Sequence, residues 1–149
     1  MTTVSTSPAT RHKKTFMIDG LTRSRLETLS MLLDTHQTDV FRRAVSLMHA
    51  LHAESEGCEI YLVDMSGRRA KLDVDENDGF EDERKMTLMF NDETLGKVSD
   101  LAEAFDIFAT YVFRRAVALF SAVYCESLSG RKIMMVNTSS GESETLRFF

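Results

Sequence analysis

Val-Phe-Arg-Arg-Ala-Val stands at Val40–Val45 and occurs again, unchanged, at Val112–Val117. Shifting the sequence by these 72 positions aligns many more residues than the six of this signature, with no gap between residues 13 and 55. A fixed internal period marks duplicated structural units. The identical pairs outside the signature include Lys13/Lys85, Thr15/Thr87, Met17/Met89, Thr22/Thr94, Leu29/Leu101, Asp34/Asp106, Thr38/Thr110, Leu47/Leu119 and Ala50/Ala122. The chain is therefore an internal duplication.

The composition is that of a globular protein, with 149 residues, 43% of them hydrophobic and 28% charged. No apolar run approaches the roughly 20 residues that cross a bilayer, and residues 1–10 lack the apolar segment of a secretory signal. Cys58 and Cys125 show no paired spacing and lie at non-equivalent repeat positions, which favours free thiols in a reducing compartment. We therefore expect a cytoplasmic protein with no membrane partner.

The formal net charge of −5 argues against a nucleic-acid partner until its distribution is considered. Residues 73–83 hold 7 of the 23 acidic residues and none of the 18 basic ones, which leaves 16 acids and 18 bases in the rest of the chain. Local sign matters more than the sum when a charged ligand docks on one face. We interpret the acidic run as a solvated linker between the two copies.

Each copy begins with alternating apolar and polar residues, at Lys13–Ile18 and Lys85–Phe90, which predicts a short β-strand. Asp19 and Asn91 follow as potential helix caps. Apolar residues at helical spacing then predict two helices per copy, separated by breaks near residues 34–37 and 106–109. Thr38 and Thr110 are the expected starts of the second helices, and the Met and Phe residues within the helices are expected in the core.

A hairpin pattern ends each copy. Glu59–Val63 and Ala70–Val74 flank one polar, glycine-containing turn, and Lys132–Val136 and Thr145–Phe149 flank another. The predicted organisation is a disordered arm (residues 1–12), a first β-α-α-β-β repeat (13–74), an acidic linker (75–83) and a second repeat (84–149). The predicted fold class is α+β.

The first strand of each copy needs a partner, because a lone six-residue strand leaves its backbone groups unpaired. We expect Lys13–Ile18 to pair antiparallel with Lys85–Phe90 and the four helices to pack behind this two-stranded ribbon. The alternation then points Phe16, Ile18, Leu88 and Phe90 toward the helices. It points Lys13, Thr15, Met17, Lys85, Thr87 and Met89 outward.

The segment Arg84-Lys85-Met86-Thr87-Leu88-Met89-Phe90-Asn91-Asp92-Glu93, the two predicted helices and the Phe-Arg-Arg-Ala-Val signature resemble the ribbon-helix-helix family of DNA-binding repressors, the Arc and Met repressor type. The first copy is similar. The resemblance implies a tandem pseudo-dimer whose ribbon enters the major groove of double-stranded DNA, where alternate outward side chains read base edges. Those positions are Lys13, Thr15, Met17, Lys85, Thr87 and Met89.

The resemblance also implies that the N-termini of the second helices, near Thr38 and Thr110, contact DNA phosphates. His36 and Gln37 are suited to the same task, whereas Phe108 and Ala109 are poorly suited. The expected function is sequence-specific transcriptional regulation, as a repressor, by a nucleoid-associated protein. Because one ribbon reads only a short half-site, two or more chains are expected side by side, with the hairpins available for assembly by strand addition.

Other interpretations stay open at this point. The arginine pairs Arg42–Arg43 and Arg114–Arg115 fit a solvated helix edge, internal ion pairs or phosphate contacts about equally. His49, His52 and Cys58 have a spacing that can bind zinc, but their repeat equivalents cannot, so neither a metal nor another cofactor is expected. No catalytic motif indicates an enzyme.

The rival function is a non-DNA protein-interaction module, antitoxin-like or an assembly protein, on the same scaffold. It is favoured by the net acidity and by the apolar segment Leu146–Phe149.

Overall fold

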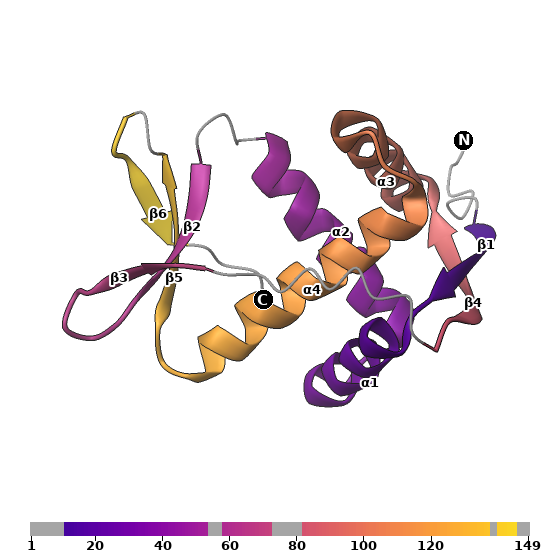
Figure 1. The fold of residues 1–149 in the computed structure, drawn as a ribbon, viewed down its shortest axis with the longest axis horizontal. Helices are drawn as coiled ribbons and strands as arrows, with labels where there is room; N and C mark the ends of the chain where they lie inside the picture. The colour runs from indigo at the N-terminus through magenta and orange to yellow at the C-terminus, as the bar shows by residue number, and fades with distance from the viewer. Residues whose placement is uncertain (1–10, 54–57, 73–81, 138–139, 146–149) are drawn as a thin grey trace, which may run out of the picture.

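The computed structural model describes residues 11–53, 58–72, 82–137 and 140–145, which form four helices and two antiparallel sheets. The first copy contains β1 (Arg11–Ile18), α1 (Gly20–Leu33), α2 (Gln37–Ala53), β2 (Cys58–Val63) and β3 (Arg69–Lys71). The second contains β4 (Arg84–Asn91), α3 (Asp92–Phe105), α4 (Ala109–Leu128), β5 (Lys132–Asn137) and β6 (Ser143–Thr145). The expected α+β class is confirmed. The two sheets lie at opposite ends of the long axis, with the helices between them (Figure 1).

β1 and β4 form the two-stranded sheet, here called the ribbon. The strands run antiparallel with Thr15 opposite Thr87, Lys13 opposite Met89, and Met17 opposite Lys85. Because Thr15 and Thr87 are repeat equivalents, a pseudo-two-fold axis passes between them, and their hydroxyl oxygens are 2.7 Å apart. The antiparallel pairing predicted from the alternation is confirmed.

One face of the ribbon packs on the helices. Ile18, Leu88 and Phe90 are buried on this face, and Phe16 is half-buried. Lys14 alternates in step with Phe16 but is exposed. The inward direction expected for the four apolar residues therefore agrees with their burial.

The duplicated signature supplies the centre of the core, where α2 and α4 cross (Figure 1). Phe41 and Phe113 are fully buried, with ring centroids 4.9 Å apart. From the ribbon, Phe90 stacks on Phe113 at 5.2 Å and Phe16 approaches the same ring at 4.4 Å. Aromatic pairs at these separations add stability beyond the burial of their area. The four rings therefore join the ribbon to both central helices.

The first helix of each copy, α1 or α3, is capped by equivalent residues at both ends. The side chains of Asp19 and Asn91 each accept a hydrogen bond from the backbone N–H three residues on, as expected for helix caps. The helices end at Asp34 and Asp106, whose left-handed φ values of 51° and 53° turn the chain toward the next helix.

The second helices start slightly earlier than predicted. α2 begins at Gln37 and α4 at Ala109, one residue before Thr38 and Thr110. The N-cap residue of α4 is Phe108, which provides no side-chain hydrogen bond. Local capping chemistry does not fix this start, which explains the small error of the prediction.

The two hairpins form one sheet, which was not predicted. β2 pairs antiparallel with β5, giving the strand order β3-β2-β5-β6. Leu62, Ile133 and Met135 are buried on one face of this sheet. Because the two six-residue strands lie inside the sheet, its edges are the three-residue strands β3 and β6.

Two boundaries differ from the predictions at the start of the chain and in the linker. β1 begins at Arg11 rather than residue 13, because Arg11 pairs with Asn91 in the ribbon. Asp82 and Glu83, expected in a solvated linker, form ion pairs with Arg23 and Arg114, respectively. The rest of the predicted arm and linker lies outside the described residues.

The bounds of the hairpin strands also differ from the predictions. β2 starts at Cys58 and β5 ends at Asn137, each one residue beyond the predicted strand. β3 covers Arg69–Lys71 instead of residues 70–74, and β6 starts at Ser143, two residues before the predicted Thr145. The apolar segment Leu146–Phe149 lies outside the described residues.

Two apolar helix residues are not in the core. Met31 is 76% exposed and Phe105 is 42% exposed, so the prediction that all Met and Phe of the helices are buried was wrong for them. Both lie in the last turn of their helices, beyond the stripe that packs on α2 and α4. The Phe105 ring instead lies 5.2 Å from the ring of His52.

Candidate nucleic-acid interface

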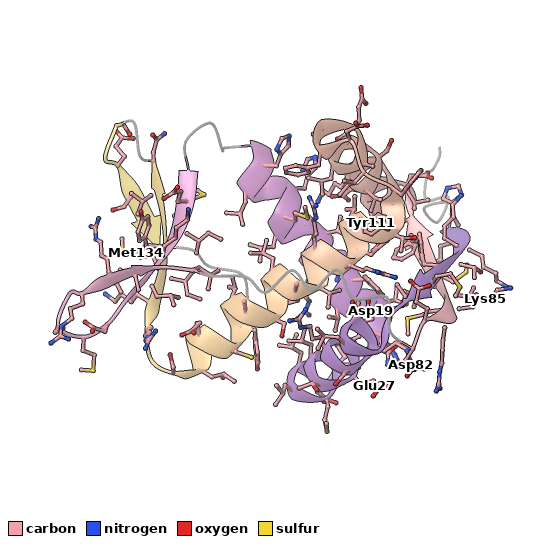
Figure 2. All side chains as sticks on the ribbon, viewed as in Figure 1. Asp19, Glu27, Asp82, Lys85, Tyr111 and Met134 are labelled. Atoms are coloured by element: carbon pink, nitrogen blue, oxygen red, sulfur yellow. The ribbon has the colours of Figure 1, made fainter. Side chains whose placement is uncertain are left out.

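The outer face of the ribbon carries all six residues predicted to read bases. Lys13, Thr15, Met17 and their repeat equivalents are all exposed. Met17 and Met89 are 40% and 41% exposed, so each thioether is half open to solvent on both sides of the axis. Figure 2 shows Lys85 projecting from the ribbon at the end of the molecule opposite Met134 in the four-stranded sheet.

The arrangement of these six residues follows from the register. Each strand contributes lysine, threonine and methionine at alternate positions, and the antiparallel pairing sets lysine of one strand against methionine of the other. The two threonines meet at the axis. The outer face is therefore the same when viewed from either end of the ribbon.

The ribbon is the basic part of an acidic chain. β1 and β4 contain five Lys or Arg residues and no Asp or Glu. His12 contacts the carboxylate of Asp92, just beyond β4. A face with this charge attracts polyanions even though the formal net charge of the chain is −5.

A cavity of about 470 Å³ lies where the ribbon meets the start of α2. Arg11, His36, Thr38 and Arg42 line it together with Met89 of the outer face, and we call this region the α2 end. Backbone N–H groups in the first turn of a helix point away from the helix body and favour anions. The cavity thus combines two guanidinium groups with a helix N-terminus beside the exposed ribbon face.

Asp39 reduces the positive charge of the α2 end. Thr35 donates a hydrogen bond to the Asp39 carboxylate at 2.8 Å, and Arg42 lies 3.5 Å from it. The Thr35 hydroxyl and then the Arg42 guanidinium lower the pKa of Asp39, against the opposing effect of burial. Asp39 is therefore ionised at neutral pH and offsets part of the Arg42 charge.

The repeat-equivalent region, the α4 end, is built from Glu83, Phe108, Thr110 and Arg114. Arg114 is 6% exposed, and its guanidinium lies 3.4 Å from Asp19 and 2.5 Å from Glu83. It also donates to the backbone oxygen of Met17 at 3.4 Å. The same arginine of the signature is therefore an exposed cavity residue in one copy and a buried structural residue in the other.

Aromatic rings cover much of the α4 end. Phe108 replaces His36 and is 79% exposed, and the Arg114 guanidinium lies 5.6 Å from the centre of the Tyr111 ring. A smaller hollow of about 320 Å³ is lined by Asp106, Ile107, Phe108 and Tyr111. Thr110 is half-buried and does not line this hollow.

The structure thus distributes the predicted phosphate-contacting residues unevenly. His36 and Thr38 share the α2-end cavity, and Gln37 is half-buried outside its lining. Sequence reasoning missed Arg11 in this cavity and left the roles of Arg42 and Arg114 open. The available signal was the exchange of Arg11 for Glu83 and of Asn91 for Asp19 at repeat-equivalent positions, which gives Arg114 two acids where the corresponding residues near Arg42 are an arginine and an asparagine.

Comparison with known proteins gives no match. No family model, no curated protein and no solved structure matches this chain.

Metal sites and membrane-spanning helices are two other features that bear on function. In the described parts of the chain, no group of three or more His, Cys, Asp or Glu could hold a metal ion, and His49 lies 3.2 Å from Asp100. None of the described helices is individually long and apolar enough to cross a membrane. Only α3 and α4 taken together have the length and composition, and they are bent by 99° at the break between them.

Proposed function

We propose that this chain is a single-chain ribbon-helix-helix pseudo-dimer that binds double-stranded DNA and acts as a transcriptional regulator, in its simplest form a repressor. The observation that carries the proposal is the outer face of the ribbon. There, two identical lysine, threonine and methionine sets face solvent around a pseudo-two-fold axis, on strands without an acidic residue. This role implies a cytoplasmic, nucleoid-associated protein.

The dimensions and chemistry of the ribbon suit the major groove. Two paired strands are about 4.8 Å apart, and the groove is about 12 Å wide and admits a two-stranded ribbon. Lys13 and Lys85 can donate to guanine O6 and N7, and the two threonines can donate to or accept from base edges. Met17 and Met89 offer apolar contact to thymine methyl groups. This use accounts for two methionines that a solvated face would not need.

The helices support this reading by fixing the ribbon. Phe90 and Ile18, which alternate with the outward residues, are 2% and 0% exposed. A one-residue slip would exchange the buried and exposed sets, so the burial of these side chains holds the register. The six outward side chains are therefore presented on a rigid base, as base reading requires.

A single ribbon covers a short half-site, so useful affinity requires more than one chain on the DNA. Assembly by strand addition, expected at the hairpins, is limited in the four-stranded sheet to the edges β3 and β6 because β2 and β5 already pair with each other. We propose a homo-oligomer on DNA that uses these edges or neighbouring helix surfaces.

The experiment compares two double variants of the full chain on duplexes selected from random DNA. Lys13→Ala/Lys85→Ala removes two positive charges from the ribbon face. Arg131→Ala/Lys132→Ala removes the same charge from the exposed start of β5, in the four-stranded sheet at the opposite end of the molecule and away from the edges β3 and β6. Far-ultraviolet circular dichroism and the melting temperature verify that both variants fold.

We expect the ribbon variant to lose at least about 2 kcal/mol of binding free energy, roughly 30-fold in Kd, because each well-placed base contact contributes about 1–3 kcal/mol. The β5 variant should stay within about threefold of the parent. Equal losses in the two variants would mean that the duplex responds to overall charge and would reject the ribbon as the reading face.

One observation favours the rival function, a protein-interaction module. Phe108 and Met31 are 79% and 76% exposed, so they present apolar surface that a protein partner could cover. A folded parent chain that retains no duplex at low salt, where electrostatic binding is strongest, would favour this rival.

A further inference from the structure

The residues that flank the two ends of the ribbon differ between the two copies of the repeat. The outer face repeats lysine, threonine and methionine around the axis, whereas the flanking positions have diverged. Arg11 corresponds to Glu83, His36 to Phe108, and Asp39 to Tyr111. At the α4 end, an acid thus replaces Arg11 and an aromatic ring replaces His36, whereas the exchange of Asp39 for Tyr111 removes an acid.

The charge balance separates the two ends. The α2 end brings together the guanidinium groups of Arg11 and Arg42 and one carboxylate, Asp39. The α4 end brings one guanidinium, Arg114, against two carboxylates. An incoming phosphate therefore meets a net positive site at the first end and a net negative one at the second, although both ends present a helix N-terminus.

The arginines at the two ends also differ in their exposure to solvent. The side chain of Arg42 is 47% exposed and the Asp39 carboxylate is 3.5 Å away, so the guanidinium can turn to a phosphate at low cost. Arg114 is 6% exposed and holds Asp19 and Glu83. Moving it would leave two carboxylates without their counter-ion, one of them deeply buried.

The position of the α2-end cavity links it to the outer face. Met89 lines the cavity and also belongs to the base-reading set, and it lies opposite Lys13 in the ribbon. A phosphodiester in the cavity would therefore lie beside the bases that the ribbon reads. This is the arrangement that lets a backbone contact set the depth and angle of the ribbon in the groove.

We propose that the chain grips the DNA backbone at one end of the ribbon only, with Arg11, Arg42 and the N-terminus of α2 binding a phosphodiester, and that the α4 end has lost this site. The inference rests on the proposed function and deepens it. A symmetric reading face is combined with a one-sided backbone contact, so the two copies of the duplication divide the work of DNA binding unequally.

The test uses matched variants at repeat-equivalent positions, measured against a random-sequence duplex over a range of salt concentrations. His36→Ala/Thr38→Ala at the α2 end is compared with Phe108→Ala/Thr110→Ala at the α4 end. Arg11→Ala/Arg42→Ala is compared with the charge-matched Arg131→Ala/Lys132→Ala at the remote start of β5. Circular dichroism and melting temperatures establish that every variant is folded.

We expect Arg11→Ala/Arg42→Ala to bind at least about tenfold more weakly than the parent and to lower the slope of log K against log salt by about 1.8, because each phosphate contact contributes about 0.9. His36→Ala/Thr38→Ala should weaken binding about threefold or more, and the α4-end pair should stay within about twofold of the parent.

Three results would decide against this inference. If the α4-end pair weakens binding as much as its α2-end counterpart, the grip is two-sided and only the proposed DNA-binding function survives. If Arg11→Ala/Arg42→Ala binds no more weakly than the remote control, the cavity is not a phosphate site. If the folded parent retains no duplex at low salt, the proposed function and this inference fail together.

Discussion

Arg114 and Arg42 occupy the same place in the duplicated signature, and we predict that their replacement has very different effects on stability. Arg114→Met keeps most of the aliphatic stem but removes the guanidinium, which leaves Asp19 and Glu83 without their counter-ion. The side chain of Asp19 is 3% exposed and that of Glu83 is 28% exposed. Arg42→Met removes an arginine that is 47% exposed and 3.5 Å from a 38% exposed aspartate.

The magnitudes follow from burial. Breaking a buried pair by removing one partner costs about 3–5 kcal/mol. Because Glu83 is partly exposed, water can hydrate its carboxylate once the guanidinium is removed. The loss of unfolding free energy for Arg114→Met should therefore lie near the lower limit, about 3 kcal/mol. For a chain of this size such a loss lowers the melting temperature by roughly 6–12 °C. Arg42→Met should cost no more than about 0.5 kcal/mol, as for other exposed pairs on a helix.

The free energies of unfolding of the parent and the two variants are measured by urea denaturation of the full chain at pH 7. An unchanged m value, the slope of the free energy against urea concentration, shows that a shift of the midpoint reports a change in stability. A second substitution identifies the cause. Asp19→Asn in the Arg114→Met background removes the buried charge while keeping a side chain that can cap α1, as Asn91 caps α3. We expect this double variant to recover at least about 1 kcal/mol.

If Arg114→Met and Arg42→Met differ by less than about 1 kcal/mol, the buried ion pairs contribute no net stability and the reasoning is wrong. If Asp19→Asn restores nothing, the loss comes from packing around the arginine stem rather than from the orphaned carboxylate.

Two further predictions concern the core and the β2–β3 turn. Phe113→Ala should cost about 3–5 kcal/mol, because the ring is fully buried against three other phenylalanines, and a loss below about 1 kcal/mol in urea unfolding would contradict this packing. The Ser66 hydroxyl and then the Arg68 backbone N–H lower the pKa of the Asp64 carboxyl by hydrogen bonding, so this stabilisation is present above the ordinary pKa of about 4 and is lost as the pH falls through the lower folded value. Asp64→Asn keeps an oxygen acceptor but cannot ionise, so its unfolding free energy should fall less steeply than that of the parent between pH 6 and 3, and superimposable pH profiles would refute the assignment.

Local patterns in the sequence were sufficient for the ribbon and its caps. Strict alternation placed Thr87 outward and Phe90 inward because a strand has a period of two, and Asp19 and Asn91 were identifiable because capping depends on neighbouring backbone groups. Apolar spacing located the helices. It did not predict that Phe105 lies beyond the packed stripe, because the end of a stripe depends on how far the partner helices extend.

The candidate site was only partly predictable. The six outward residues followed from alternation together with the family resemblance. The burial of Arg114 did not follow, because its six-residue neighbourhood is identical to that of Arg42 and the difference comes from Asp19 and Glu83, which are distant in sequence. The pairing of β2 with β5 is another long-range event, and hairpin signals do not specify a partner.

The position of Thr15 opposite Thr87 has an evolutionary consequence. In a symmetric homodimer every substitution appears twice, so a residue on one side of the axis cannot change without its mirror image. A chain that carries both halves escapes this constraint. Residue 83 is an acid while its repeat equivalent, residue 11, is an arginine, a difference that a symmetric homodimer could not hold. Joining the halves in one chain therefore permits different side chains at the two ends of a single ribbon.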